Sequence, residues 1–161
     1  MSRLFAFIHG CKIIKLGYFV KLFVIDISIH NILGQRIMFK NLVCIASGKG
    51  GVGKSTTAVN LSLALSGMNK KVGLLDADIY GPSIPMMMGA TLGARPEIRG
   101  GKYMIPIESH GIKFNSMGLL VDEKTAMVWR APMIISAFNQ ILNDTDWNDL
   151  DYLIVDMPPG T

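Results

Sequence analysis

Residues 48–55 read Gly48-Lys49-Gly50-Gly51-Val52-Gly53-Lys54-Ser55 and match the phosphate-loop pattern G-x-x-x-x-G-K-[ST]. The pattern is informative only where it follows a strand and opens a helix. Residues 41–47 before it are apolar enough for a short buried strand. Residues 56–65 after it have the apolar spacing and small side chains of a helix packed on a sheet. The sequence therefore predicts a strand, a glycine loop and a helix in the order that a phosphate site requires.

The residue types in this loop suit a triphosphate bound with Mg²⁺. Glycines at positions 48, 50, 51 and 53 let the backbone N–H groups approach phosphate oxygens and permit positive φ angles. The start of the helix adds unpaired N–H donors and the positive end of the helix dipole. Lys54 can reach the β and γ phosphates, and the Ser55 hydroxyl can bind Mg²⁺. The expected nucleotide-binding residues are Gly48, Lys49, Gly50, Gly51, Val52, Gly53, Lys54, Ser55 and Thr56.

The same letters also contain a dinucleotide fingerprint, Gly48-x-Gly50-x-x-Gly53. Asp76 ends the next predicted strand, residues 71–76, near the place of a ribose-binding acid. Two observations oppose this alternative. A Lys-Ser pair at the helix start gains little from a pyrophosphate without metal, and further acids occur where a Mg²⁺–ATP site needs them.

Three aspartates follow predicted strands. Asp76 and Asp78 bracket the end of strand 71–76, and Asp156 ends strand 152–156. Ligands of open α/β sheets collect at the carboxyl ends of the strands, beside the loop. A single Asp there is as readily a helix cap or turn residue. Three of them next to a phosphate loop favour a role in handling metal and water.

Lys49 makes the loop similar to the deviant Walker A signature of the MinD-like ATPases. Three further segments narrow the resemblance: residues 76–83 (DADIYGPS), 128–133 (VWRAPM) and 151–161 (DYLIVDMPPGT). With the loop, they resemble the Mrp/Nbp-type iron–sulfur carrier ATPases, a family that includes a mitochondrial carrier linked to complex I assembly. The similarity runs from about Leu42 to the last residue.

The resemblance implies roles for nucleotide and metal. Lys54 and the loop amides would hold the phosphates of ATP. Ser55 would bind Mg²⁺ directly, while Asp76 and Asp156 would hold it through its waters. The implied activity is ATP hydrolysis coupled to [4Fe–4S] cluster assembly and transfer to recipient apoproteins.

The resemblance also implies catalytic residues, namely Lys49, Lys54 and Asp78. Asp78 would orient the attacking water. Lys49 would reach the nucleotide of the second subunit in a homodimer, as an arginine finger does. Trp129 and Arg130 have no such clear family role, and packing with a surface or interface contact is favoured for them over nucleotide contact.

The family binds its cluster through a Cys-x-x-Cys pair downstream of the Pro-Pro-Gly-Thr turn, and its adenine-binding segments also lie downstream. The cysteines of this chain are Cys11 and Cys44. Cys44 is interpreted as a small buried hydrophobe in strand 41–47, so no cluster ligand is expected in this chain. Two alternatives to the carrier remain, a MinD/ParA-type positioning ATPase and an inactive truncated fragment. Segments 80–83 and 129–133 weigh against the positioning ATPase.

The expected fold is α/β, a doubly wound, mostly parallel P-loop NTPase sheet truncated at its C-terminal side. Residues 111–117 are expected as a third parallel strand, 94–104 as a loop or hairpin, and 132–143 as a helix with Pro near its start. The methionines at 86–88 are interpreted as packing residues. Because a truncated sheet exposes apolar edges, we expect the isolated chain to be marginally stable or aggregation-prone.

The positive charge is concentrated in residues 1–40, which hold six Lys/Arg and one acid, whereas residues 41–161 hold ten and eleven. The predicted ATPase part, 41–161, therefore has no sign of a nucleic-acid partner. Residues 1–40 are a leader of uncertain status, either a mitochondrial presequence or a mispredicted exon. The alternation at 25–30 is typical of a half-buried strand.

Lys21, Asp26 and His30 interrupt the apolar stretches of the leader, so no transmembrane helix is expected. The three histidines are scattered and support no metal cluster. Two cysteines and no secretory pattern indicate a reducing compartment. The resemblance implies the mitochondrial matrix, with the cytoplasm as the alternative.

Overall fold

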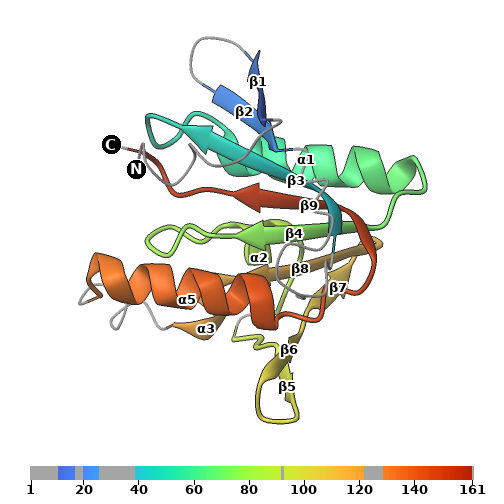
Figure 1. The fold of residues 1–161 in the computed structure, drawn as a ribbon, viewed down its shortest axis with the longest axis vertical. Coiled ribbons are helices and arrows are strands. Elements are labelled where there is room, and N and C mark those ends of the chain that lie inside the picture. The colour runs from blue at the N-terminus through green and yellow to red at the C-terminus, as the bar shows by residue number, and fades with distance from the viewer. Residues whose placement is uncertain (1–10, 17–19, 26–38, 92, 122–128, 161) are drawn as a thin grey trace.

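The computed structural model describes residues 11–16, 20–25, 39–91, 93–121 and 129–160. A seven-stranded sheet in the order β1-β2-β3-β9-β4-β8-β7 forms its centre (Figure 1). The four central strands run parallel: β3 (Phe39–Ser47), β9 (Leu150–Asp156), β4 (Val72–Asp76) and β8 (Ile112–Ser116). The predicted strands at 41–47, 71–76, 111–117 and 152–156 are therefore confirmed, within two residues at each end.

The edges of the sheet are antiparallel, which the sequence did not indicate. On one side β2 (Val20–Ile25) pairs with β3 and with β1 (Cys11–Leu16), and on the other β7 (Ile107–Ser109) pairs with β8. β1 and β2 lie within the predicted leader, whose boundary at residue 40 stays a prediction. Of the strand predicted at 25–30, only Ile25 falls within the described residues.

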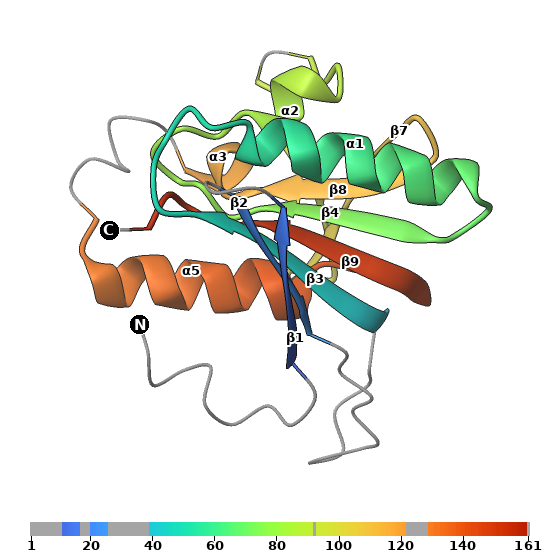
Figure 2. The same ribbon diagram turned by 90° about the horizontal axis from the view of Figure 1, so that it is seen from above.

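Two long helices cover opposite faces of the sheet, α1 (Lys54–Gly67) on one and α5 (Ala131–Asp144) on the other (Figure 2). The alternation of side chains along a strand supplies both layers. In β4, Leu74 belongs to the core with Ala58 of α1, whereas its neighbour Leu75 belongs to the core with Ile141 of α5. Both leucines are fully buried. The α/β, doubly wound fold is confirmed, with parallel strands in its central part.

Short elements lie between the strands of the sheet along the chain. They are α2 (Ile84–Met87), α3 (Met117–Leu120) and the hairpin of β5 (Glu97–Arg99) with β6 (Tyr103–Ile105). The predicted hairpin at 94–104 is thus confirmed. Proline occupies the first turn of α5, as expected.

The packing role predicted for the three methionines is right for one of them. Met88 is 1% exposed, but Met86 is 79% and Met87 is 38% exposed. Helix α2 has only four residues, so it turns a single narrow side toward the sheet. The prediction for Met86 and Met87 is therefore wrong.

Trp129 and Arg130 precede α5. Trp129 is half-buried and packs against the core cluster on the α5 face, which confirms the packing predicted for it. Arg130 is exposed and occupies the N-cap position of α5. Neither residue lines the cleft described below.

Candidate functional site

The glycine loop connects β3 to α1, as predicted. Gly51 and Gly53 have φ angles of 72° and 85°, which favour glycine. Gly53 is the N-cap of α1 and makes no side-chain cap, so N–H groups of the first helical turn stay available to a ligand. Gly48 and Gly50 do not adopt the positive φ that glycine permits. No described atom lies within 4 Å of a Cβ built on either residue, so the space that they leave is open to a ligand.

A cleft of about 410 Å³ lies beside this loop. Its walls come from three segments that are distant in sequence: the loop and the start of α1, the turn after β4, and the turn after β9. The lining residues are Gly50, Gly51, Gly53, Lys54, Ser55, Thr56, Asp78, Gly81, Ser83, Met87 and Pro159. Seven of the predicted site residues are in this lining, whereas Gly48, Lys49, Val52, Asp76 and Asp156 are not.

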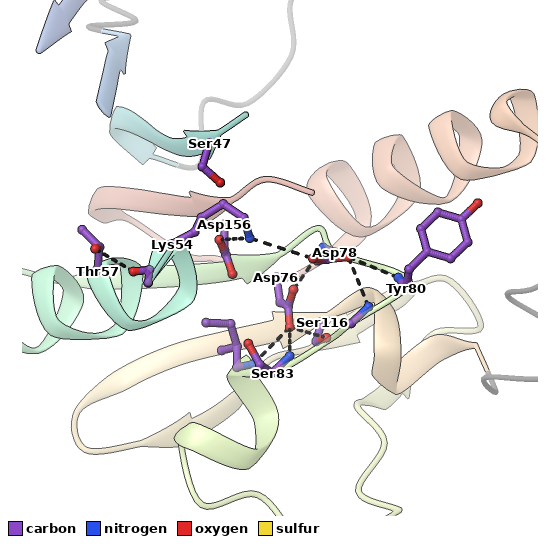
Figure 3. Close-up of polar contacts among 12 residues, drawn as sticks. Ser47, Lys54, Thr57, Asp76, Asp78, Tyr80, Ser83, Ser116 and Asp156 are labelled. Atoms are coloured by element: carbon purple, nitrogen blue, oxygen red, sulfur yellow. Dashed lines mark hydrogen bonds and ion pairs between the residues drawn. The ribbon is translucent and has the colours of Figure 1, made fainter. Parts of the chain in front are cut away.

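Lys54 lies at the bottom of the cleft and is 7% exposed. Its Nζ donates a hydrogen bond to Asp156 Oδ1 at 2.9 Å and lies 3.9 Å from Asp78 Oδ2 (Figure 3). One cation therefore faces two carboxylates in a poorly solvated place. Because buried charges need partners of opposite sign, this place favours the binding of an additional cation.

Asp156 ends β9, opposite Ile45 of β3 and Asp76 of β4 in the strand register. The residue is fully buried, and its Oδ2 has no hydrogen-bond partner among the described residues. A buried carboxylate oxygen that accepts nothing is costly, by about 1–3 kcal/mol or more. Asp156 Oδ2 is therefore suited to accept from the water of a hydrated cation.

Asp76 is fully buried at the end of β4 and fastens the segment that follows it. Its Oδ1 accepts from Asp78 N at 3.0 Å, and its Oδ2 accepts from Ser83 N and Ile84 N, both at 3.1 Å, and from Ser116 Oγ at 3.2 Å. Burial raises the pKa of this carboxyl from 3.8 to about 7, against the lowering effect of these hydrogen bonds. Asp76 does not line the cleft, and its oxygens already have protein donors.

Asp78 lines the cleft and is 8% exposed. Its Oδ1 accepts from Tyr80 N and Gly81 N, each at 3.2 Å, in a turn closed by the side chain. Its Oδ2 remains directed toward Lys54. The carboxylate is therefore held in one orientation at the wall of the cleft.

Lys49 is exposed and does not line the cleft beside its own loop. Its carbonyl oxygen accepts from Ser47 Oγ at 2.8 Å. Gly160 N in turn donates to Ser47 O at 2.9 Å and ties the turn after β9 to the end of β3. The sequence reasoning missed Ser47, although its place at the carboxyl end of a strand was a usable signal.

Ser83 and Ser116 were also missed. Ser83 lines the cleft, and the Ser116 hydroxyl binds Asp76 from β8. Position at the end of the predicted strand 111–117 could have indicated Ser116. The contact of Ser83 with Asp76 depends on the folding of the connection and has no sequence signal.

Within the described part of the chain, no three His, Cys, Asp or Glu side chains are placed to hold a metal ion directly. A cation held mainly by phosphate, water and one hydroxyl is the arrangement that Mg²⁺ prefers. The unpartnered oxygen of Asp156 and the surplus of carboxylates around Lys54 fit such a hydrated ion.

A parallel sheet whose first central strand leads through a glycine loop into a helix, with a buried lysine facing strand-end aspartates, defines a P-loop protein of the α/β class. A family model described as "NUBPL iron-transfer P-loop NTPase" matches residues 38–161. The chain belongs to this family of iron–sulfur cluster carrier NTPases.

Curated relatives agree with the family. The chain is 60% identical over 122 residues to the "Iron-sulfur cluster carrier protein" of Escherichia coli K12, 54% over 124 residues to the "Iron-sulfur cluster transfer protein NUBPL" of Mus musculus, and 53% over 123 residues to the "Iron-sulfur protein required for NADH dehydrogenase, mitochondrial" of Arabidopsis thaliana. Each match covers 76% of this chain but 33%, 38% and 39% of the respective relative.

A solved nucleotide-binding protein from Archaeoglobus fulgidus in complex with ADP has the same fold, with a TM-score of 0.61 and 35% identity. The similarity covers 74% of this chain and 44% of that one. None of the helices in the described ranges is long and apolar enough to cross a membrane.

Proposed function

We propose that the chain binds Mg²⁺–ATP in the cleft beside the glycine loop and forms the phosphate-binding part of an ATP-hydrolysing iron–sulfur cluster carrier. The observation that carries this proposal is the surroundings of Lys54. Its ammonium is buried between Asp156 and Asp78 at the bottom of an open glycine-lined cleft. The Lys54 ammonium can exchange its contact with a carboxylate for a contact with a phosphate while it stays largely buried.

The proposed contacts follow from this geometry. Lys54 and the N–H groups of residues 48–56 bind the phosphates. Ser55 binds Mg²⁺ through its hydroxyl, and Asp156 binds it through water. Asp76 also binds Mg²⁺ through water, but more weakly than Asp156, because its oxygens already accept four hydrogen bonds. Bound Mg²⁺ supplies neutralisation of the charge on the β and γ phosphates.

For hydrolysis, Asp78 orients the attacking water from the wall of the cleft. Lys49 contacts the nucleotide of the second subunit in a homodimer. Its exposure and its absence from the lining of its own cleft support this role. In this proposal Lys54 binds phosphate, Lys49 stabilises the charge on the nucleotide of the second subunit, and Asp78 orients the water.

The cargo is a [4Fe–4S] cluster handed to recipient apoproteins. Cys44 is buried in the core on the α5 face, so we assign no cluster ligand to it. The names of the relatives favour a carrier over a positioning ATPase. The Arabidopsis relative, named as mitochondrial, supports placement in the mitochondrion.

Calorimetric titration of the full chain with ATP and Mg²⁺ tests the proposal. We expect binding by the unmodified chain, and a loss of about 10- to 100-fold in affinity for Lys54→Ala, the size of one or two hydrogen bonds to charged groups. Lys70→Ala, which removes an exposed lysine beyond the end of α1, serves as the matched control and should bind normally. Circular dichroism of each variant checks folding. Failure of the unmodified chain to bind would contradict the proposal and favour the inactive-fragment alternative.

A further inference from the structure

The segment from Asp76 to Ile84 carries Asp78 and forms one wall of the cleft. Both of its ends are fastened to a single carboxylate. Asp76 Oδ1 binds the N–H group of Asp78, and Asp76 Oδ2 binds those of Ser83 and Ile84 (Figure 3). The position of the Asp76 side chain therefore determines where this wall stands.

The Asp76 side chain is in turn held from β8. Ser116, fully buried at the end of that strand, donates from Oγ to Asp76 Oδ2 at 3.2 Å. The same Oγ accepts from Gly118 N at 3.1 Å, where it caps α3. One hydroxyl thus connects the carboxylate to the junction between β8 and α3.

The junction touches the same segment at a second place. The backbone of Gly118 lies so close to Pro82 that a Cβ built on Gly118 would collide with the Pro82 ring. Pro82 is flanked by Gly81 and Ser83, which both line the cleft. Since neither partner can rearrange freely, this contact supports the middle of the wall.

Ser116 is itself held rigidly. Its N–H group donates to Asn115 Oδ1 at 2.9 Å, and Asn115 Nδ2 donates to Thr145 Oγ1 at 2.9 Å. Asn115 and Thr145 are fully buried. A buried polar network whose groups are paired favours one arrangement.

We propose that Ser116 and Gly118 are positioning residues for the nucleotide cleft, which act through Asp76 and Pro82 to set the place of Asp78 relative to Lys54. This inference rests on the proposed binding of Mg²⁺–ATP. The groups involved belong to β4, the turn after it, β8 and α3, and none of them belongs to the glycine loop. They should therefore influence the Mg²⁺-dependent part of the affinity and leave the contacts of the loop with phosphate intact.

The experiment compares Ser116→Ala with the unmodified chain in two measurements. Hydrogen exchange without nucleotide should become at least about tenfold faster at the amides of Asp78, Ser83 and Ile84, since Asp76 loses one hydrogen bond. Calorimetry should show the gain in ATP affinity on adding Mg²⁺ reduced by about tenfold, with affinity in its absence nearly unchanged. Ser116→Thr keeps a hydroxyl and should restore both.

Two further variants separate positioning from stability. Ser62→Ala removes another fully buried hydroxyl, bonded to Ala58 O within α1, and should change neither measurement. Gly118→Ala retains Ser116 and displaces Pro82, so it should also reduce the Mg²⁺-dependent gain. It keeps the inference testable if Ser116→Ala does not fold.

An unchanged Mg²⁺-dependent gain in Ser116→Ala and Gly118→Ala would overturn the inference, and so would equal losses with and without Mg²⁺. Absence of any ATP binding by the unmodified chain would instead contradict the proposed function. The exchange measurement needs no nucleotide, so unchanged exchange at residues 78–84 would overturn the positioning role even then.

Discussion

Asp76 shows how one side chain can serve the fold and the site together. Its burial disfavours the charged form, and four donors only partly offset this effect. The carboxyl stays in this place because the segment with Asp78 depends on it for its own buried N–H groups. At the residue scale, the site therefore contains a carboxyl group whose pKa is about 7.

The raised pKa of Asp76 predicts a pH dependence of stability. Between the unfolded value of 3.8 and about 7, the folded chain binds more protons at this group than the unfolded chain. The contribution of Asp76 to the free energy of unfolding therefore falls as pH rises through this window, by an amount on the order of 4 kcal/mol. Urea unfolding of the unmodified chain and of Asp76→Asn at pH 5 and pH 8 measures it.

The asparagine variant does not titrate, so it should lose less stability between pH 5 and pH 8 than the unmodified chain. Identical losses in the two proteins would contradict the raised pKa. Asp151 acts in another range. Its hydrogen bond from Lys40 lowers its pKa from the usual 3.8, so its stabilising effect is present at both compared pH values and is lost only in more acidic solution.

At the scale of elements, β4 depends on a glycine. Gly73 is the second residue of this strand, and a Cβ there would collide with Leu150 and lie 3.0 Å from Leu153 Cδ1 and 3.1 Å from Trp147 Cε3. Leu150 and Leu153 belong to β9, the neighbour of β4, and all three side chains are buried. The side chains of Leu150, Leu153 and Trp147 can therefore pack this closely against β4 only because residue 73 has no side chain.

Gly73→Ala should destabilise the chain by about 1–3 kcal/mol, the usual effect of overpacking a filled core. Gly67→Ala is the control, because a Cβ there meets nothing within 4 Å among the described residues and its φ is not positive. It lies at the end of α1, where alanine favours the helix. The free energies of unfolding in urea measure both changes. Equal stability of Gly73→Ala and the unmodified chain would contradict the packing described here.

At the scale of the whole molecule, the role proposed for Lys49 requires two copies of the chain. Lys54 faces Asp78 and Asp156 inside the cleft, whereas Lys49 is exposed outside its lining. A second copy can supply its Lys49 to the bound nucleotide only when the two glycine loops face each other. The proposed homodimer therefore requires the glycine loops of the two copies to face each other.

We expect light scattering to show a doubled molar mass for the chain with Mg²⁺ and a non-hydrolysed ATP analogue, and less association for Lys49→Ala. Affinity for the nucleotide, measured on dilute protein, should change by less than about threefold, since the substitution keeps the backbone N–H of residue 49 and Lys49 does not line the cleft of its own subunit. Lys70→Ala should associate normally. A Lys49→Ala variant that loses affinity and association equally would contradict the role across the dimer.

The elements around the loop could be predicted because their signals are local. Residues 48–55 carry glycines at Gly51 and Gly53, where positive φ is needed, and a helix pattern follows at once. Asp78 and Asp156 were placed correctly at strand ends, since parallel strands bring their carboxyl ends to one edge. Met86 and Met87 were predicted wrongly, because composition does not show which side of a four-residue helix meets the sheet.

The chain's sequence by itself determined the class of the protein, the glycine loop and the acids that belong with it, because these depend on spacing of a few residues and on the direction of parallel strands. Only the tertiary structure decided which of these acids has an oxygen free for a ligand and which is used to hold the protein's own backbone. Asp156 Oδ2 has no hydrogen-bond partner among the residues that the structure describes, whereas the oxygens of Asp76 accept from Ser116 and from the backbone of residues 78–84. The physical reason is that burial and hydrogen-bond pairing depend on β4, β8 and β9 lying side by side, and these strands are far apart along the chain.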